Sequence, residues 1–530
     1  MHQTANNQVE PSPPPAQTGK GKTLAQFASL AVMTQGVLLL NQILLLPIQL
    51  RVWGTDLTAY WLSVMAVAAA TQVMDFGLRA AGHAELIRHT NDPSDHEAGN
   101  EFAKLWAWMR ILMLLSTVVL VVADYVFHHF CLGMDYPLWR TALLLGYALE
   151  VAICVRVNFL DTQGFYREAE AGYLVLAGAR LFLAVGALLI FGASPAVLAY
   201  IWFFTGVFAL AQQSLLCRKT GHLKLFAPLP HDLSIRTLAT VRHTMADPCA
   251  NWVRFNLPVL VLSAIAAPIA VVMYGALRAI FGAGRATILQ MSRYASVEYL
   301  ALRQARRNGI AEMHLIMMVL LAAFFASGMA ALVIADNGRL ASLMVNKIYQ
   351  DLPTYQMVAV TFGMSNAFFA YQITAAVSRR AGEVAEIAHR QYFYILACGL
   401  FAVPALILKS MLLWLVLMLV ADVLMALTFL IWPSRDSILR QTSCGWRGAA
   451  AAATSSTLVF VMWLTIHFAK FSFLTGRGFA DILCTIAFFL AWILLIGFVD
   501  LSLASGLQSG PRSLLLNLLH RFRAPKLQNE

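Results

Sequence analysis

The sequence predicts an all-α polytopic membrane protein with about 14 transmembrane helices. Of its 530 residues, 59% are hydrophobic and only 12% are charged, and the mean hydropathy is +0.68. Soluble globular proteins have about 45–50% apolar and about 25% charged residues. The apolar residues of this chain also fall in long runs, and about 20 such residues cross the roughly 30 Å of hydrocarbon in a bilayer. Both observations place the chain in a membrane.

Fourteen apolar runs are long enough to span a bilayer. They cover residues 27–50, 57–80, 104–127, 138–160, 172–193, 195–216, 244–266, 268–292, 311–335, 355–378, 392–409, 411–432, 450–469 and 480–504. Residues 1–26 precede the first run, and their polar, Pro-rich composition predicts a disordered cytosolic tail. No run resembles a cleaved signal peptide, because the first is too long and lacks a small-residue cleavage site.

The predicted spans divide into two pseudo-symmetric lobes of six helices and a C-terminal helix pair. Residues 27–216 form the N-lobe with spans 1–6, residues 217–243 form a basic cytosolic loop, and residues 244–432 form the C-lobe with spans 7–12. Spans 13 and 14 lie within residues 433–504, and residues 505–530 form a cytosolic tail. A faint similarity between residues 41–47 and 251–258 supports parallel repeats, since each segment begins a lobe.

The positions of Lys and Arg predict the orientation in the membrane. With a cytosolic N-terminus, 25 of the 38 Lys and Arg residues fall on the cytosolic side, 7 fall on the opposite side and 6 fall inside spans. Such a bias is typical of cytoplasmic loops, so both termini are expected in the cytosol. The same bias accounts for the net charge of +11 without a nucleic-acid partner.

Motifs for metal binding and catalysis are absent from the sequence. The seven cysteines show no CxxC or Cys/His spacing, so we predict neither a disulfide framework nor a metal site. The sequence also contains no HExxH or GxSxG motif and no paired-acid motif. We therefore expect a protein that is not an enzyme and has no cofactor.

Polar residues follow one face of four predicted spans, the first two of each lobe. They are Gln35, Gln42 and Gln49 in span 1; Gln72, Asp75 and Arg79 in span 2; Asp247, Asn251, Arg254 and Pro258 in span 7; and Tyr274, Arg278, Gly282 and Arg285 in span 8. Spacings of three, four and seven residues place side chains on the same side of a helix. We therefore expect a water-filled cavity between the lobes, with arginines at about half depth.

A cationic cavity inside a membrane suits an anionic substrate. Arginine donates bidentate hydrogen bonds to phosphate and stays charged at any physiological pH. The candidate substrate-binding residues are Arg254, Arg278, Arg285, Asn251, Gln42, Gln49, Arg51 and Asp75, and the candidate ion-coupling residues are Asp247 and Asp75. Asp422, an acid in a late span, is a further candidate for a proton relay.

Structural roles are the alternative for these buried polar residues. The span arginines Arg110, Arg156 and Arg180 have Glu150 and Asp161 nearby as partners for ion pairs between helices. Asp75 can pair with Arg79 one turn away. The glutamines of span 1 can hydrogen-bond to neighbouring helices.

Two patches of sequence resemble a known family. Residues 47–54 read PIQLRVWG, Tyr60 and Trp61 follow, and residues 75–78 read DFGL. This order resembles the first two spans of the Wzx-type lipid-linked oligosaccharide flippases, which are polysaccharide biosynthesis proteins of the multidrug/oligosaccharidyl-lipid/polysaccharide exporter (MOP) superfamily. Residues 251–280 are similar to spans 7 and 8 of that family.

The resemblance implies alternating access across a cavity between two lobes. It implies that a polyprenyl-pyrophosphate-linked oligosaccharide is flipped across the bacterial inner membrane for surface polysaccharide, exopolysaccharide or O-antigen synthesis. The polyprenyl tail would stay among membrane lipids, with spans 13 and 14 as a candidate groove. A proton or a sodium ion would drive the cycle, and other polysaccharide assembly proteins are expected partners. Two alternatives stay open: a small-molecule exporter of the same superfamily, and a membrane polysaccharide polymerase or ligase.

Overall fold

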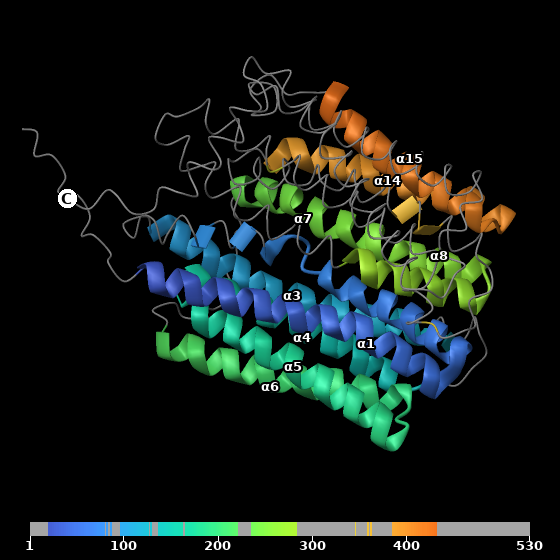
Figure 1. Cartoon of the computed structure of the whole chain (residues 1–530). Helices are drawn as coiled ribbons and strands as arrows, with labels where there is room; N and C mark the ends of the chain where they lie inside the picture. Colours follow the sequence, from blue (N-terminus) through green and yellow to red (C-terminus); the bar gives the residue numbers. More distant parts are fainter. Residues whose placement is uncertain are drawn as a thin grey trace, which may run out of the picture.

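The structure is a computed structural model in which long helices run side by side (Figure 1). It describes residues 20–79, 81–82, 85–86, 96–126, 128–129, 136–162, 165–220, 235–282 and 384–431, with residues 318, 345, 358–359 and 361–362. Within these residues all regular structure is helical. The predicted spans 450–469 and 480–504 and the C-terminal tail lie outside the described residues, as do most of spans 311–335 and 355–378.

The first group of helices forms what we call the N-terminal bundle. It consists of α1 (Lys20–Ala68), η1 (Ala69–Gln72), α3 (His96–Val126), α4 (Trp139–Thr162), α5 (Tyr166–Phe191) and α6 (Pro195–Thr220). The predicted spans between residues 104 and 216 match α3 to α6 within a few residues, except that α3 and α5 begin earlier. The earlier starts add polar turns at the bundle end, which hydropathy does not count as membrane.

A glycine divides the long helix α1 where the sequence predicts two separate spans. Gly54 has φ 74° and ψ −176°, a conformation that residues with a Cβ avoid. The break leaves a leg over residues 20–53 and a second leg over residues 55–68. Leu45 of the first leg and Trp61 of the second belong to one core cluster, so both legs pack into the same bundle.

The second leg ends before the residues that the sequence places on its polar face. After η1 the chain forms a turn in which Phe76 and Gly77 have φ 50° and 78°. The Asp75 carboxylate accepts a hydrogen bond from the Gly77 backbone nitrogen at 2.9 Å, a local bond that competes with helix formation. The prediction of a continuous helix over residues 57–80 is therefore wrong, and Asp75 lies in a turn.

The second group of helices forms the C-terminal bundle. It consists of α7 (Ile235–Phe255), α8 (Leu257–Ile265), α14 (Val384–Leu408) and α15 (Met411–Ile431), with the helix Pro268–Gly282. The predicted span over residues 244–266 is two helices that meet at Asn256, just before Pro258, which has no backbone N–H to donate to the preceding turn. In Figure 1 α7, α14 and α15 lie along one side of the molecule, and α3 to α6 along the other.

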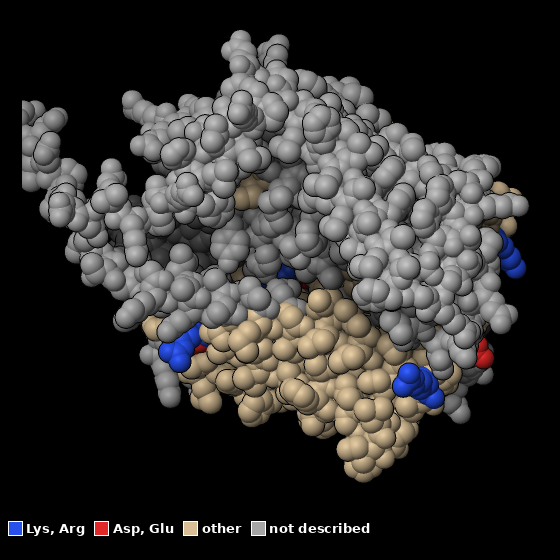
Figure 2. All heavy atoms as spheres, viewed as in Figure 1, with Lys and Arg blue, Asp and Glu red and all other residues tan. Residues whose placement is uncertain are grey.

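The outer surface of the helices is apolar. Among the described residues, six helices are long and apolar enough to cross a membrane: Gly36–Gln72, Asn100–Val126, Trp139–Leu160, Arg167–Phe191, Pro195–Cys217 and Ala388–Leu408. Phe182, Phe191 and Ile407 are 77%, 80% and 73% exposed, and Figure 2 shows a broad uncharged face with its charges at the edges. A broad apolar outer surface marks contact with a membrane or with a partner protein. The chain is a multi-pass membrane protein.

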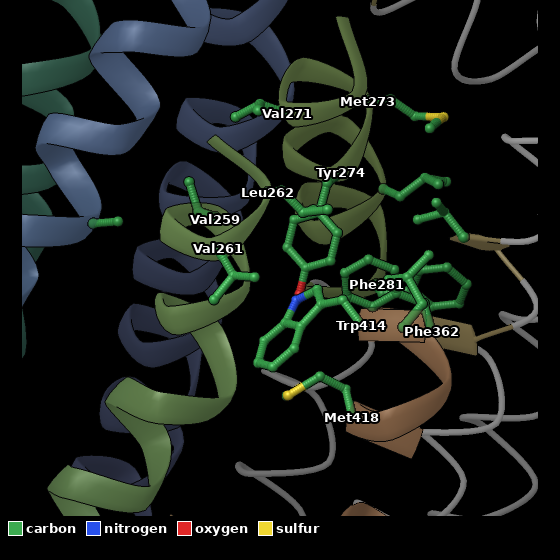
Figure 3. Packing of buried hydrophobic residues seen from close by; sticks show 14 of the residues in the cluster. Val259, Val261, Leu262, Val271, Met273, Tyr274, Phe281, Phe362, Trp414 and Met418 are labelled. Atoms are coloured by element: carbon green, nitrogen blue, oxygen red, sulfur yellow. The ribbon is translucent and has the colours of Figure 1, made fainter. Parts of the chain in front are cut away.

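The helices of each bundle pack closely on their neighbours. In the N-terminal bundle α4 lies against α6 and α1 against α5. At Gly146 of α4 a Cβ atom would lie 3.2 Å from the Phe203 backbone nitrogen, and small residues allow such close approach in membranes. In the C-terminal bundle, Tyr274, Phe281 and Trp414 come together in one core cluster (Figure 3).

Candidate transport cavity

A cavity of about 260 Å³ lies between the two bundles. Its lining comes from three segments: η1 with the turn after it, α7 with Asn256 after it, and the first half of α14. The lining residues are Ala69, Gln72, Val73, Asp75, Gly77, Arg79, His243, Thr244, Asp247, Pro248, Asn251, Trp252, Phe255, Asn256 and Gln391. A polar cavity therefore lies between the bundles, as the sequence predicts.

Helix α7 contributes more described residues to this lining than any other element. Thr244, Asp247, Pro248, Asn251 and Trp252 all line the cavity, and their spacing of three, four, seven and eight residues from Thr244 keeps them on one side of the helix. This helix is much more polar than its neighbours. Its polar face is expensive to place in lipid and is instead turned to the cavity.

Among the described residues, the lining of this cavity is not cationic. It contains two carboxylates, Asp75 and Asp247, one guanidinium, Arg79, and one imidazole, His243. Four side-chain amides complete the polar groups: Gln72, Asn251, Asn256 and Gln391. With a neutral imidazole the lining has one more negative than positive charge. This lining can form several hydrogen bonds with a polar solute. It has too few positive charges to neutralise a phosphate group.

The Asp75 carboxylate makes two local contacts at the edge of the cavity. Its Oδ2 lies 3.2 Å from Nε of Arg79 in an ion pair, and its Oδ1 accepts the bond from Gly77. The pairing of Asp75 with Arg79, the structural alternative from the sequence, is therefore present. Asp75 and Arg79 both line the cavity, so the same contacts that stabilise the turn also form part of the cavity wall.

Asp247 lies on the opposite wall and is held by α14. Its Oδ1 accepts a hydrogen bond of 2.7 Å from Nε2 of Gln391. Asn251 lies one turn further along α7 and also lines the cavity. The structure thus brings together three of the sequence-predicted residues, Asp75, Asp247 and Asn251.

Arg254 does not line this cavity among the described residues, but it lines a second, smaller cavity together with Pro258, Tyr274 and Asp422. Its Nη2 lies 3.0 Å from Oδ1 of Asp422 in an ion pair, and its guanidinium carbon lies 4.7 Å from the ring centre of Tyr394. These partners come from α15 and α14, so Arg254 points into the C-terminal bundle. Asp422 lies 168 residues further along the chain, and no spacing rule could pair it with Arg254.

Arg278 lies behind the cavity wall. Its Nη2 donates a hydrogen bond of 3.2 Å to Oδ1 of Asn256, and Asn256 is itself a lining residue. Arg278 is therefore not among the described lining residues, in contrast to the prediction. The Asn256 side chain connects Arg278 to the cavity. Arg285 lies outside the described residues.

The candidates from the first leg of α1 do not reach the cavity. Gln49 is buried with 4% of its surface exposed, and Arg51 is exposed, yet neither lines the cavity. The Gln42 side chain lies outside the described residues. The regular spacing of these glutamines therefore does not predict cavity lining.

Two other buried arginines of the N-terminal bundle have carboxylate partners. Arg180 of α5 pairs with Glu150 of α4, and the second carboxylate oxygen of Glu150 accepts a hydrogen bond of 3.2 Å from Gln72. Arg140 of α4 pairs with Asp124 of α3. The expected pairing of Arg180 with Glu150 is confirmed, and Arg156 instead donates to the Ser214 hydroxyl at 2.8 Å.

Several lining residues were not predicted from the sequence. Gln391 precedes the predicted span 392–409, and Asn256 lies in the middle of the predicted span 244–266. Helix α14 begins earlier than its apolar run, so Gln391 joins the wall. His243 also precedes its predicted span. Burial, together with nearby His389 and Arg242, lowers the pKa of His243 below its ordinary value.

Comparison with known proteins rests on the fold. No family model and no curated protein sequence matches the chain. Solved structures do match: a MATE protein in the straight conformation has a TM-score of 0.56 and 15% identity, over 82% of this chain and 97% of that chain.

Two further structures agree. An inward-facing multidrug resistance MATE family transporter of the MOP superfamily has a TM-score of 0.54 and 15% identity, over 80% of this chain and 95% of its own. A MOP superfamily transporter from Pyrococcus furiosus, described by a reversed polarity of its binding pocket, has a TM-score of 0.54 and 14% identity, over 83% and 96%. The fold is that of the MATE transporters.

Proposed function

We propose that this protein is a membrane transporter that carries a polar solute across the bilayer by alternating access. The observation that carries the proposal is the polar cavity between the two bundles of a MATE fold. Ligand sites form preferentially where domains meet, with a few polar groups converging on the ligand. A cavity between two bundles becomes open to one side and then the other when the bundles rock against each other.

The charge of the lining supports small-molecule export better than pyrophosphate binding. Asp75 and Asp247 can accept hydrogen bonds from a cation or a hydroxyl, and the ring of Trp252 offers a face for an apolar or cationic group. One of the matched structures is a multidrug resistance MATE family transporter. We therefore propose export of a small polar or cationic molecule as the first substrate class.

Flipping of a polyprenyl-pyrophosphate-linked oligosaccharide is the second proposed substrate class. It is supported by the DFGL sequence at residues 75–78 and by the resemblance of residues 47–54 and 251–280 to the lipid-linked oligosaccharide flippases. Four side-chain amides in the lining also suit sugar hydroxyls. Under this proposal the cavity takes the sugars, and cations for the pyrophosphate come from residues outside the described lining. A bacterial inner membrane with both termini cytosolic, and coupling to a proton or a sodium ion, belong to this proposal.

A host strain that lacks the gene, complemented with the parent protein or a variant, distinguishes the two proposed substrate classes. In a host that lacks the gene, a flippase role predicts lipid-linked oligosaccharide trapped on the cytosolic face and loss of surface polysaccharide. An exporter role predicts normal polysaccharide and greater sensitivity to cationic compounds. Asn251→Leu, which fills the cavity with an apolar side chain, should fail to restore the affected phenotype. Restoration by Asn251→Leu at equal membrane levels would count against transport through this cavity.

A further inference from the structure

Two side chains of α7 donate hydrogen bonds to backbone carbonyl groups on the N-terminal side of the cavity. The Thr244 hydroxyl donates a hydrogen bond of 2.8 Å to the carbonyl oxygen of Gly77. The Trp252 indole nitrogen donates a bond of 3.2 Å to the carbonyl oxygen of Ala66. Thr244, Gly77 and Trp252 all line the cavity. The contacts between the bundles are thus part of the cavity wall.

The two contacts lie at different points along the cavity. Thr244 and Trp252 are eight residues apart, and a helix rises about 1.5 Å per residue, so the contacts are separated by about 12 Å along α7. The lining from α7 begins at His243 and continues to the break at Asn256. Thr244 therefore lies near one end of the lining, and Trp252 lies closer to the other.

The contact at Thr244 is a close approach of two backbones. Gly77 has φ 78°, and a Cβ atom there would lie 2.4 Å from the backbone nitrogen of Met245. The Asp75 carboxylate holds this conformation through its bond to the Gly77 nitrogen. The turn therefore packs directly on the backbone of α7 at Met245, near the middle of the helix, and nothing larger than glycine fits between them.

A proline lies between the two contacts. Pro248 is inside α7, where it removes one backbone hydrogen bond and favours a bend. It is four residues from both Thr244 and Trp252. A bend at Pro248 can therefore move the part of α7 that precedes it, including Thr244, while the part after it stays on the N-terminal bundle.

We propose that the Thr244–Gly77 contact is a gate at one end of the cavity, and that α7 opens it by bending at Pro248 while the Trp252–Ala66 contact stays in place. This inference rests on the proposed transport through the same cavity. It assigns the hinge and the closing contact to named residues. Binding of a solute or a proton at Asp75 would loosen the turn that carries Gly77, which joins occupancy of the cavity to the gate.

The test measures access to the cavity and needs no knowledge of the substrate. The cysteine variant Asn251→Cys is labelled with a small maleimide in membrane vesicles, and labelling of the parent protein, with its own seven cysteines, is subtracted. Thr244→Val keeps the shape of the side chain and removes the donor. We expect it to raise the labelling rate of Asn251→Cys about fivefold, the factor that corresponds to one lost hydrogen bond. Thr244→Ser should restore the slow rate.

Thr117→Val is the matched control. The Thr117 hydroxyl is also buried and hydrogen-bonded, but to Met113 in its own helix at 2.6 Å. Its replacement should leave the labelling rate within twofold of the parent. An equal rate for Thr244→Val and its parent, or an equal rise for Thr117→Val, would overturn the gate.

Pro248→Ala tests the hinge in a protein that keeps both contacts. It should slow labelling at position 251 severalfold, because a straight α7 leaves the gate closed more of the time. An unchanged labelling rate in Pro248→Ala would show that Pro248 is not the hinge. Pro248→Ala also tests the proposal if Thr244→Val does not fold. Failure of the transport assays with these labelling results intact would refute the proposed function and leave the gate standing.

Discussion

Arg254 of α7 and Asp422 of α15 form a buried ion pair that joins two distant parts of the chain. Nη2 of Arg254 lies 3.0 Å from Oδ1 of Asp422, and the two side chains are 7% and 4% exposed. Tyr394 of α14 lies beside them, with its hydroxyl 3.4 Å from Nε of Arg254. One guanidinium thus connects three helices of the C-terminal bundle. In the described structure these contacts therefore link α7 to α14 and α15, at a place where Arg254 and Asp422 also line a small cavity.

Replacement of Arg254 should destabilise the protein more than replacement of both partners. Arg254→Met leaves Asp422 buried without this cation, and breaking a buried pair on one side costs about 3–5 kcal/mol. In Arg254→Met/Asp422→Leu no charge remains at this site, so most of the loss should be recovered. Thermal unfolding of the purified protein in detergent measures both. Equal unfolding temperatures for the single and double variants would show that the pair is not a structural contact.

The sequence predicts the helices well where hydropathy alone decides. The bounds of α4 and α6 follow from apolar runs between loops, and the structure places them within a few residues of the prediction. It predicts less well where a local bond interrupts a helix. The turn at Asp75 and the break at Asn256 lie inside apolar runs, and hydropathy does not register a backbone with positive φ or a helix that stops and restarts.

The sequence predicts a polar cavity between the bundles, and a polar cavity lies there, while its described lining contains one arginine, Arg79. Helical spacing correctly places Asp247 and Asn251 on a cavity-facing side of α7. Spacing cannot show which partners a side chain finds on other helices. Arg254 shares the predicted stripe, yet its long side chain reaches Asp422 and Tyr394, and that choice depends on how α14 and α15 pack.

Gly77→Ala should destabilise the protein, and Gly178→Ala should not. An alanine at position 77 takes a left-handed conformation, which costs about 1–2 kcal/mol, and its Cβ atom would overlap the backbone of Met245. At Gly178 of α5 a Cβ atom meets nothing within 4 Å, and alanine is the better helix former. Unfolding in detergent compares them. Equal stability of the two variants would show that the turn does not pack on α7 as described.

Acidification should weaken the protein through His243. The pKa of His243 in the folded protein is lowered by burial and by nearby His389 and Arg242, so the unfolded chain takes up the proton first as the pH falls. The contribution of this group to stability is therefore complete above the ordinary histidine pKa of about 6.5 and is lost as the pH falls below it. Unfolding temperatures at pH 7.5 and 5.5 measure the effect.

His243→Gln provides the comparison for that titration. Glutamine keeps a hydrogen-bonding side chain and carries no charge at either pH, so the variant should lose less stability between pH 7.5 and 5.5 than the parent. All other side chains are the same in the two proteins, so their contributions cancel in the difference. A loss of the same size in both proteins would assign the pH dependence to other groups.

Arg140→Met should destabilise the N-terminal bundle, in contrast to Arg51→Met. Arg140 pairs with Asp124 through two nitrogens and donates a hydrogen bond of 2.7 Å to the Tyr60 hydroxyl. Removing the guanidinium leaves a buried carboxylate without this cation, at a cost of about 3–5 kcal/mol. Arg51 is exposed, so the same substitution there should change stability by less than about 0.5 kcal/mol. Thermal unfolding of the two variants at equal detergent concentration measures this difference, and a similar loss in both would mean that the Asp124 pair contributes nothing beyond an exposed arginine.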